Sequence, residues 1–478
     1  MFKFTPLICD EAKSFLSDKE RVLDILNCFG SPCNIVFPRV MDRNIDSFKE
    51  VFKKYGISGK IFYAHKCNKS SSLVKEALYK DINIDVASEN ELKDALSNGF
   101  TGAKIEATGP KNREFIYLGV LQNITFNVDN IEELKDIIEM TKLLNRKGKT
   151  KILLRLTGFS SDETKIMNKQ SRFGIPTRQF DECLRIIKQN EKYINFLGLA
   201  FHLDTVSLNE KVIAIENCIE LFEKCFELDL ENDPCVLDIG GGFKANYILD
   251  KKEWNDSISE LKESILRPEE KDLTWNNASF GLRQEKGTLR GALNIYNYYD
   301  DVVGAKFLDE ILSTKLTKYQ DRSIGEILQE NMISLYIEPG KALLDQVGIN
   351  LAKITYTKRS ENNNILVGVD MKKSDLLIGE QEMFVDPIII SNKEEKPTNE
   401  GCYFIGNLCM ENDFIYKHKI FTGKEIYKGD CIVFPNTAGY FMDFEQSKTI
   451  MQNVAKKVIC DSKDGKLKFY LDNTYNPF

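Results

Sequence analysis

The sequence predicts a parallel (β/α)8 barrel joined to a smaller β-rich domain. Short runs of continuous apolar residues alternate with amphipathic helical patterns through most of the first 340 residues. Such runs indicate strands that are buried on both faces, and eight of them alternating with helices are typical of a closed TIM barrel. After about residue 345 the pattern changes to apolar runs separated by polar turns, which predicts antiparallel strands.

The predicted barrel strands are separated by segments with a helical pattern. The strands are GKIFYAH, INIDVAS, KIEATG, ITFNVD, KILLRLT, FLGLAFHL, CVLDIGG and SLYIEPG. The helices between them carry boundary signals. Ser88 and Glu91 form a capping-box pattern that opens one helix, and Gly99 is placed to end it. Residues 130–148 repeat this arrangement, with a polar start, apolar spacings of three and four, and a terminal glycine.

Two domains are expected, because 478 residues exceed what one compact core usually serves. The barrel is expected over residues 30–345, and the β-rich domain over 1–29 together with 346–478. Residues 244–330 interrupt the alternation before the last barrel strand, as an insert rich in Trp, Tyr, Asn and charged residues. Inserts of this length are usually functional or oligomer-forming, and this one could form a lid.

Composition excludes several classes of protein. The net charge is −7 and no long Lys/Arg run is present, so we expect no binding of nucleic acid. Charged residues interrupt the first apolar run at Asp10, and no stretch reaches the roughly 20 apolar residues of a membrane span. The 12 cysteines form no CxxC pair and there are only 3 histidines. We therefore expect a cytoplasmic protein with reduced thiols and no metal site.

Polar residues follow the ends of the predicted barrel strands. They are Lys66, Asp85, Arg155, His202, Glu338 and the three glycines Gly240, Gly241 and Gly242. Catalytic groups of such barrels come from the C-terminal ends of the strands, so these residues are expected to share one pocket. Each has an ordinary structural explanation when taken alone, such as a surface charge for Lys66 or a satisfied, half-buried ring for His202. Their combination favours a functional site.

The three glycines suit an anion. Glycine lets the backbone turn tightly and point N–H groups at a phosphate. A tight strand-to-helix turn without a ligand explains them about equally well, because the spacing is neither GxGxxG nor that of a P-loop. A phosphate at the glycines, with a lysine across the barrel, would fit a phosphorylated aldehyde held as a Schiff base.

Eight segments, in chain order, carry a resemblance to a known family. They are YAHKCN (63–68), DVAS (85–88), SRFGIP (171–176), FHLDT (201–205), IGGGF (239–243), EPGK (338–341), GNLCMEND (406–413) and AGY (438–440). They resemble the fold-type III pyridoxal-phosphate enzymes, the ornithine and diaminopimelate decarboxylase family, over nearly the whole chain. The resemblance implies an alanine-racemase-like fold, with a TIM barrel and a C-terminal antiparallel β domain. The insert and residues 436–444 are similar to a longer, little-characterised bacterial branch.

The resemblance implies pyridoxal 5'-phosphate as the cofactor and assigns residues to it. Lys66 would form the Schiff base, because a desolvated lysine can lose its proton and act as a nucleophile. His202 would stack on the pyridine ring, and Glu338 would pair with the ring nitrogen. Asp85 and Arg155 would lie near the Schiff base and the ring hydroxyl. A protonated ring stabilises the carbanion left when carbon dioxide departs, so Glu338 favours decarboxylation over racemisation.

The resemblance also assigns the cofactor phosphate. Its expected ligands are Gly240, Gly241, Gly242, Thr205, Lys341 and Tyr440. Lys341 stands where the family normally has arginine, and Thr205 stands where serine is common. A lysine can still neutralise a phosphate, although it offers a point charge instead of a two-pronged fork.

The remaining assigned residues lie in the β-rich part. Cys409 would be the proton donor for the product carbon, supplied to the barrel of a partner subunit in a head-to-tail homodimer with shared active sites. Asp413 is expected at the substrate. Met410 stands where ornithine and diaminopimelate decarboxylases carry an acidic residue, and methionine cannot pair with an ammonium. Glu411 could replace that acid only if the loop is shifted, so we expect a substrate other than free ornithine, lysine or diaminopimelate.

Three functions remain open at this point. The leading hypothesis is a pyridoxal-phosphate-dependent amino-acid decarboxylase. An amino-acid racemase or epimerase on the same scaffold is the nearest alternative, and Glu338 and Cys409 argue against it. A non-catalytic, decarboxylase-like regulator would be expected to have lost Lys66, Cys409 or the glycines, and all of them are present.

Overall fold

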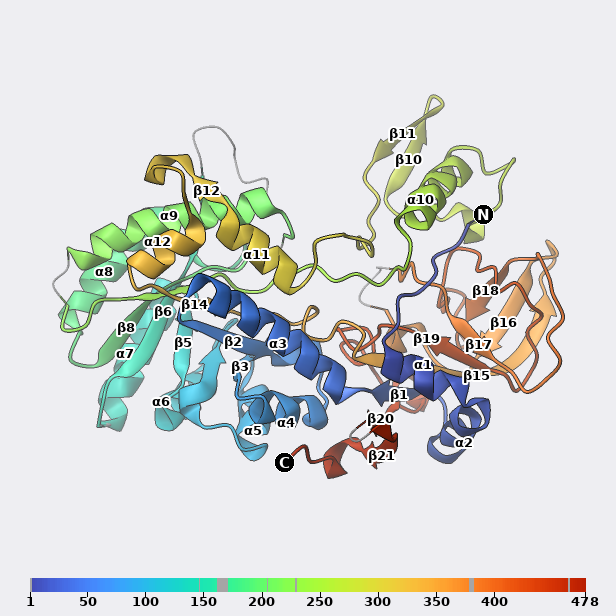
Figure 1. The fold of residues 1–478 in the computed structure, drawn as a ribbon, viewed down its shortest axis with the longest axis horizontal. Coiled ribbons are helices and arrows are strands. Elements are labelled where there is room, and N and C mark those ends of the chain that lie inside the picture. Colours follow the sequence, from blue (N-terminus) through green and yellow to red (C-terminus); the bar gives the residue numbers. More distant parts are fainter. Residues whose placement is uncertain are drawn as a thin grey trace.

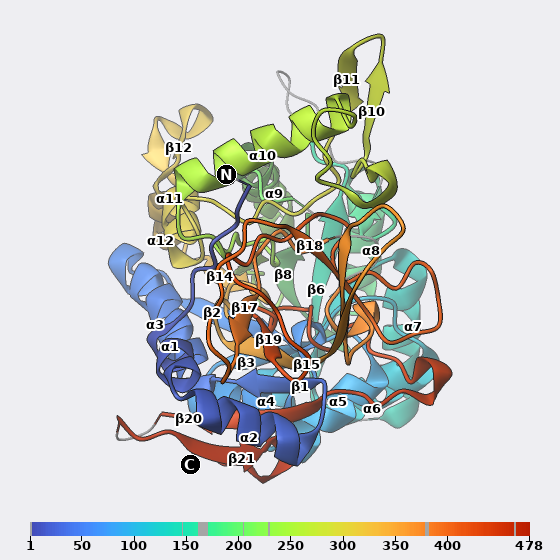
Figure 2. The same ribbon diagram turned by 90° about the vertical axis from the view of Figure 1, so that its right-hand side faces the viewer.

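The protein consists of a barrel and a β domain that lie side by side (Figure 1). The computed structural model describes residues 2–145, 147–160, 171–203, 205–227, 230–377, 382–462 and 465–478. In the perpendicular view the strands of the β domain lie in front of the barrel (Figure 2). Among the described residues, no helix combines the length and the apolar character that a membrane crossing requires.

Eight parallel strands close into the barrel, which confirms the predicted fold class. In order around the barrel they are β2 (Gly59–Ala64), β3 (Asn83–Val86), β4 (Ile105–Ala107), β5 (Thr125–Val128), β6 (Thr150–Thr157), β8 (Ile194–Ala200), β9 (Val236–Asp238) and β14 (Ser334–Ile337). The ring closes where β14 pairs with β2, with Leu335 opposite Gly59. A short strand, β7 (Ile175–Pro176), adds to the end of β6. Each predicted run overlaps one barrel strand.

Helices surround the barrel on its outer face. They are α3 (Pro38–Tyr55), α4 (Ser71–Tyr79), α5 (Glu89–Ser97), α6 (Arg113–Gln122), α7 (Ile131–Leu144), α8 (Phe180–Gln189), α9 (Leu208–Phe226), α11 (Ala305–Ser313) and α12 (Ile324–Glu330). The predicted helix starts are present, because Ser88 accepts a hydrogen bond from the Glu91 N–H and Asn130 accepts one from the Glu133 N–H. Helix α7 stops earlier than expected, since Asn145 adopts a left-handed conformation with φ 42°.

The β domain is a mainly antiparallel sheet. Its strands are β1 (Cys33–Val36), β15 (Gly348–Arg359), β16 (Ile365–Val369), β17 (Ile388–Ile390), β18 (Cys402–Ile405), β19 (Cys431–Phe434), β20 (Lys456–Asp461) and β21 (Lys468–Leu471). Two pairs, β1 with β20 and β16 with β18, are parallel. Helices α1 (Asp10–Ser17) and α2 (Lys19–Phe29) precede β1. Because β1 hydrogen-bonds to β15 and β20, we propose that the domain boundary lies after this strand and not at residue 30.

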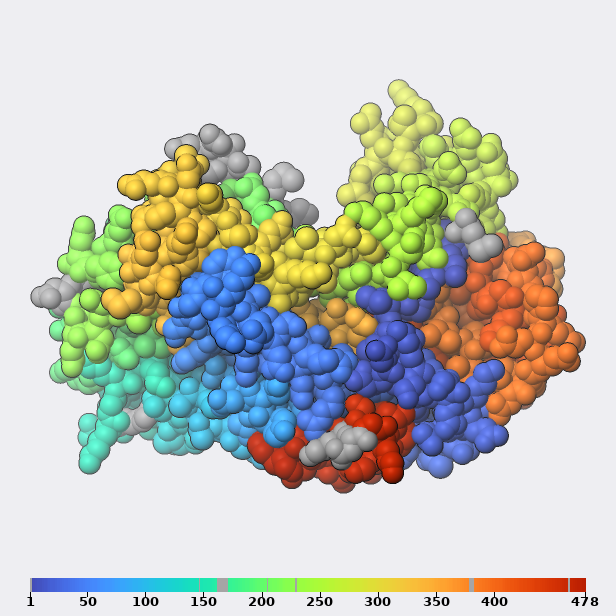
Figure 3. All heavy atoms as spheres, in the orientation of Figure 1, coloured from blue at the N-terminus to red at the C-terminus, as the bar shows by residue number. Residues whose placement is uncertain are grey.

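The insert is divided between the two domains. Helix α10 (Lys251–Leu266) packs on the β domain, where Trp254 contacts Phe4, and Phe4 contacts Phe384. All three rings belong to one buried apolar cluster, so this half of the insert completes the core of the β domain. The hairpin of β10 (Leu282–Glu285) and β11 (Thr288–Gly291) is largely exposed and rises beside a notch in the surface (Figure 3). Within the insert, this hairpin is the part to which the prediction of a lid refers.

A segment of the β domain covers the C-terminal end of β2. The Tyr440 N–H donates to the Cys67 carbonyl at 2.8 Å, and Asn68 Nδ2 donates to the Ala438 carbonyl at 2.9 Å. This segment therefore borders the turn that carries Lys66, whose side chain is 33% exposed.

Candidate active site

Lys66 lies in a single 3₁₀ turn (His65–Cys67) directly after β2, beside the end of β3. Its Nζ is 3.8 Å from Asp85 Oδ2. Burial would lower the pKa of Lys66, but the charges of Asp85 and Glu338 outweigh burial and raise it. The unliganded lysine is therefore an ammonium, which must lose a proton before it can act as the nucleophile expected from the sequence. Asp85 is fully buried, and its Oδ1 accepts a hydrogen bond from the Thr108 hydroxyl at 2.6 Å.

Glu338 and His202 face each other across the barrel end. His202 Nδ1 lies 3.5 Å from Glu338 Oε2 and 3.3 Å from the Gly241 nitrogen. Burial alone would raise the pKa of Glu338, but His202, Lys66 and Arg155 lower it to about 2. Burial lowers the pKa of His202. Glu338 is consequently a fixed, buried carboxylate.

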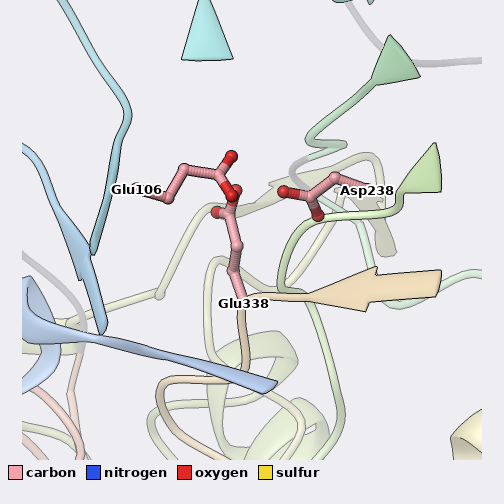
Figure 4. Close-up of side chains that lie close together, drawn as sticks. All are labelled: Glu106, Asp238 and Glu338. Carbon is pink, nitrogen blue, oxygen red and sulfur yellow. The ribbon is translucent and has the colours of Figure 1, made fainter. Parts of the chain in front are cut away.

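Two carboxyl groups that the sequence reasoning missed converge on Glu338. Glu106 in β4 and Asp238 in β9 point toward it from opposite sides of the barrel (Figure 4). Burial raises the pKa of both groups well above the ordinary value, and the charge of Glu338 raises it further. Both are therefore neutral acids around one anion. The sequence did contain a signal, because each is a charged residue within an otherwise apolar strand, IEA or VLD.

Gly240, Gly241 and Gly242 form a tight loop after β9. A Cβ at these positions would lie 2.7 Å from His202 Nδ1, 2.8 Å from the Glu338 carbonyl and 2.6 Å from the Thr205 carbonyl, respectively. Gly240 and Gly242 also have φ values of +64° and +77°, which disfavour any other residue. Steric contact and backbone conformation both require glycine here.

Thr205 and Tyr440 stand at two borders of the pocket. The Thr205 oxygen accepts from the Ser207 N–H at 3.0 Å, which leaves its own proton for donation. Its neighbour in the motif, Asp204, lies outside the described residues. Tyr440 has φ +74°, a strained conformation for a large side chain, and its hydroxyl lies next to Gly340. Strain of this kind is concentrated at functional sites.

Lys341 is held by aromatic rings instead of carboxylates. Its Nζ lies 3.3 Å from the centre of the Tyr296 ring and 5.2 Å from that of Phe441. Burial lowers the pKa of Lys341 to about 8. Tyr296 belongs to the insert, so the insert reaches the predicted phosphate site, a contact that no local sequence signal announces.

Arg155 extends from β6 toward the same region. Its Nη1 lies 3.6 Å from Asp129 Oδ1, and its guanidinium covers the Phe173 ring at 4.9 Å. The side chain is buried, and its charge contributes to the low pKa of Glu338. Arg155 therefore joins Lys66, Asp85, His202 and Glu338 in one electrostatic unit.

Within one chain, none of the described hydrogen bonds or ion pairs joins the Cys409 loop to this unit. Cys409, Met410 and Glu411 are exposed at its tip. Asp413 is buried, and its two oxygens accept the N–H groups of Lys373 at 2.9 Å and Leu408 at 2.8 Å. These bonds hold the shape of the loop. The contact of Asp413 with a substrate remains a prediction.

The barrel residues fit pyridoxal phosphate. The pocket provides an amine, an anionic carboxylate, an imidazole, a glycine loop and a lysine without a carboxylate partner among the described residues. Asp85 Oδ2 is buried and has no hydrogen-bond partner there. An aromatic aldehyde carrying a ring nitrogen, a hydroxyl and a phosphate would complement this donor set.

Comparison with known proteins identifies the family. The family model described as "Pyridoxal-dependent decarboxylase, pyridoxal binding domain" matches residues 40–274, which include Lys66 and the glycine loop. The chain belongs to the fold-type III pyridoxal-phosphate-dependent decarboxylases. Pyridoxal phosphate is accordingly the cofactor, and the recognition from sequence is confirmed.

Relatives in this family cover nearly the whole chain. The "Uncharacterized protein y4yA" of Sinorhizobium fredii is 28% identical over 426 residues, which span 88% of this chain and 85% of the relative. The diaminopimelate decarboxylase of Methanocaldococcus jannaschii is 23% identical over 438 residues, 89% of this chain and 85% of that one. A crystal structure of the M. jannaschii diaminopimelate decarboxylase with L-lysine superposes with a TM-score of 0.71 at 18% identity, covering 98% of this chain and 94% of that chain. The shared fold includes both domains.

Proposed function

We propose that the protein decarboxylates an amino acid whose side chain does not end in a free ammonium group. The observation that carries the proposal is Glu338, a buried carboxylate with its pKa lowered to about 2 at the position that would face the ring nitrogen. The bound cofactor withdraws electrons from the α-carbon of the amino acid, so that carbon dioxide can leave. Glu338 maintains the ring protonation on which this withdrawal depends.

Lys66 and Asp85 would manage the proton that covalent attachment of the cofactor requires. The ammonium of Lys66 must lose a proton before Nζ can react. Burial, together with the charge of Glu338, raises the pKa of Asp85 to about 7, and Asp85 lies 3.8 Å from that Nζ. A carboxylate titrating near neutral pH is a suitable acceptor for this proton.

Cys409 would supply the proton that replaces the lost carboxyl group. Its Sγ is exposed in the single chain, on a loop shaped by the buried Asp413. An exposed family motif of this kind supports a head-to-tail homodimer in which the loop enters the partner's barrel. The thiol would then be buried and would carry its proton at Sγ.

Met410 supports the restriction on the substrate. It is 51% exposed at the tip of the loop, next to Cys409. A thioether cannot accept a hydrogen bond of useful strength from an ammonium. Glu411, one position later, is exposed in the single chain. Its carboxylate would contact a substrate only if the loop changes conformation on assembly.

Attachment of the cofactor is tested on the purified protein. It should be yellow, and borohydride reduction should leave the cofactor on Lys66, as read by peptide mass spectrometry. Lys66→Ala should be colourless, whereas Lys69→Ala, three residues on, should retain the colour. A colourless wild-type protein, or a label on another lysine, would contradict the assignment.

The reaction is tested with L- and D-amino acids, with carbon dioxide release and optical rotation followed in parallel. We expect carbon dioxide from at least one amino acid other than ornithine, lysine and diaminopimelate. Loss of rotation without carbon dioxide would establish the racemase alternative. Cofactor binding without either reaction would support the non-catalytic regulator.

The shared active site is tested by mixing two inactive variants. Lys66→Ala and Cys409→Ala homodimers each lack one component at both sites, but a heterodimer has one complete site. Random exchange should therefore restore about a quarter of wild-type turnover. No recovery after exchange, verified by mass, would show that Cys409 serves its own chain or no site at all.

A further inference from the structure

Lys211 is a buried cation that none of the assigned roles includes. It lies in the first turns of α9, nine residues after His202, and its side chain is fully enclosed. Its Nζ donates to the Gly241 carbonyl at 2.7 Å. Within the part of the chain that the structure describes, no carboxylate lies within ion-pair distance of it. Burial lowers the pKa of Lys211 to about 8.

Another buried lysine shows how unusual this arrangement is. The Lys111 side chain is also fully enclosed, but its Nζ lies 2.9 Å from Glu133 Oε1 and donates to two backbone carbonyls as well. Buried charges are normally paired in this way, because transfer of an isolated charge from water is strongly unfavourable. Among the residues that the structure describes, Lys211 therefore lacks the anion that Lys111 has.

The acceptor of Lys211 determines the orientation of the glycine loop. In a trans peptide the C=O and the following N–H point in opposite directions. Since Lys211 binds the Gly241 carbonyl, the Gly242 N–H points away from the ammonium. No acceptor for this N–H occurs among the described hydrogen bonds, and a Cβ at Gly242 would lie 2.6 Å from the Thr205 carbonyl, so the backbone packs closely at this point of the loop. The Gly242 N–H is thus a hydrogen-bond donor on the side of the glycine loop that faces away from Lys211.

We propose that Lys211 is a positioning residue of the phosphate site, which turns the Gly242 N–H toward the cofactor phosphate and places a positive charge behind the loop. The inference rests on the pyridoxal-phosphate enzyme of the proposed function. The phosphate site would then have two lysines, Lys211 and Lys341, and Lys341 stands where the family normally has arginine. Lys211 acts through the loop and needs no direct contact with the phosphate.

The experiment compares two cofactor forms that differ only in the phosphate. Apo-protein of full length is titrated with pyridoxal phosphate and with pyridoxal, and the ratio of the two dissociation constants is taken from the absorbance of the bound aldehyde. Both ligands use Lys66, so the ratio isolates the phosphate site. The variants are Lys211→Met and Lys211→Gln, which remove the charge in different ways, and the matched control is Lys111→Met.

We expect both Lys211 variants to lose about 10-fold or more of the preference for pyridoxal phosphate, the size of one hydrogen bond to a charged group. Lys111→Met should lower thermal stability and leave the ratio at the wild-type value. A ratio within about 2-fold of wild type in either folded Lys211 variant would overturn the inference. Should wild type bind neither aldehyde, the proposed function fails instead, so the two failures are distinguishable. If Lys211→Met does not fold, Lys211→Gln alone decides.

Discussion

The variant Asp413→Ala tests whether the buried Asp413 contacts the substrate or holds the shape of the Cys409 loop. The resemblance assigns Asp413 to the substrate, whereas the structure shows both of its oxygens accepting backbone N–H groups, those of Lys373 and Leu408. If it only contacts substrate, its loss raises KM and leaves the fold intact. If it holds the loop, its loss lowers the free energy of unfolding and misplaces the thiol of Cys409.

The expected magnitude follows from the two bonds. Hydrogen bonds to a charged acceptor contribute roughly 1.5–3 kcal/mol each, and their removal leaves two partly buried N–H groups without an acceptor. We therefore expect Asp413→Ala to lower the free energy of unfolding by about 3 kcal/mol or more. Asp413→Asn keeps one carbonyl acceptor and should lose about half of that. Turnover should fall with the loss of stability, because the proton donor depends on the loop.

The assay is urea unfolding of the dimer at fixed protein concentration, combined with kcat and KM on the best substrate. Glu411→Gln is the matched control, since Glu411 is an exposed acid on the same loop. It should unfold at the wild-type urea concentration. If Asp413→Ala unfolds with wild-type stability while only KM rises, the structural reasoning is refuted and the substrate role stands alone.

Two further predictions follow from buried groups. Burial raises the pKa of Asp85 from 3.8 to about 7, so the folded apo-protein keeps a proton that the unfolded chain releases. The free energy of unfolding should therefore fall as pH rises from about 4 to about 7, and it should fall less in Asp85→Asn. The free energies of unfolding are measured by urea titration at pH 5 and pH 8, and an equal difference between the two pH values in wild type and variant would contradict this. Phe4→Ala should cost about 3–5 kcal/mol, because the ring packs on Trp254 and Phe384, whereas the exposed Leu249→Ala should change stability by less than about 0.5 kcal/mol. Wild-type stability of Phe4→Ala by calorimetry would show that the insert does not complete the core.

The barrel could be predicted because its strands are local in sequence. Runs such as GKIFYAH and SLYIEPG are apolar on both faces and end in polar residues, and both properties are visible without tertiary contacts. Lys66, Asp85 and Glu338 could be assigned to one site because each follows the end of a barrel strand, and their charges do interact in the structure. The glycine loop was ambiguous in sequence, and the close approach of His202 and Thr205 explains its composition.

The missed residues depend on distant contacts. Lys211 occupies a helix of ordinary amphipathic pattern, and its contacts with the Gly241 carbonyl and the Phe243 ring come from a distant segment of the chain. Tyr296 reaches Lys341 from an insert without a recognisable motif. The pairing of β1 with β20 joins residues too far apart for a single sequence to reveal. Glu106 could have been found, since a charge within an apolar barrel strand is itself a signal.

The position of β1 has a consequence for synthesis of the chain. Cys33 pairs with Leu351 on one side and with Lys456 on the other, so the strand waits for partners more than 300 and more than 400 residues downstream. At ribosomal rates of about 5–20 residues per second, this wait lasts roughly 20 to 80 s, during which the barrel can already form. An apolar strand with two open edges is meanwhile available to other chains. Newly made copies at high local concentration could therefore exchange this strand before each sheet is complete.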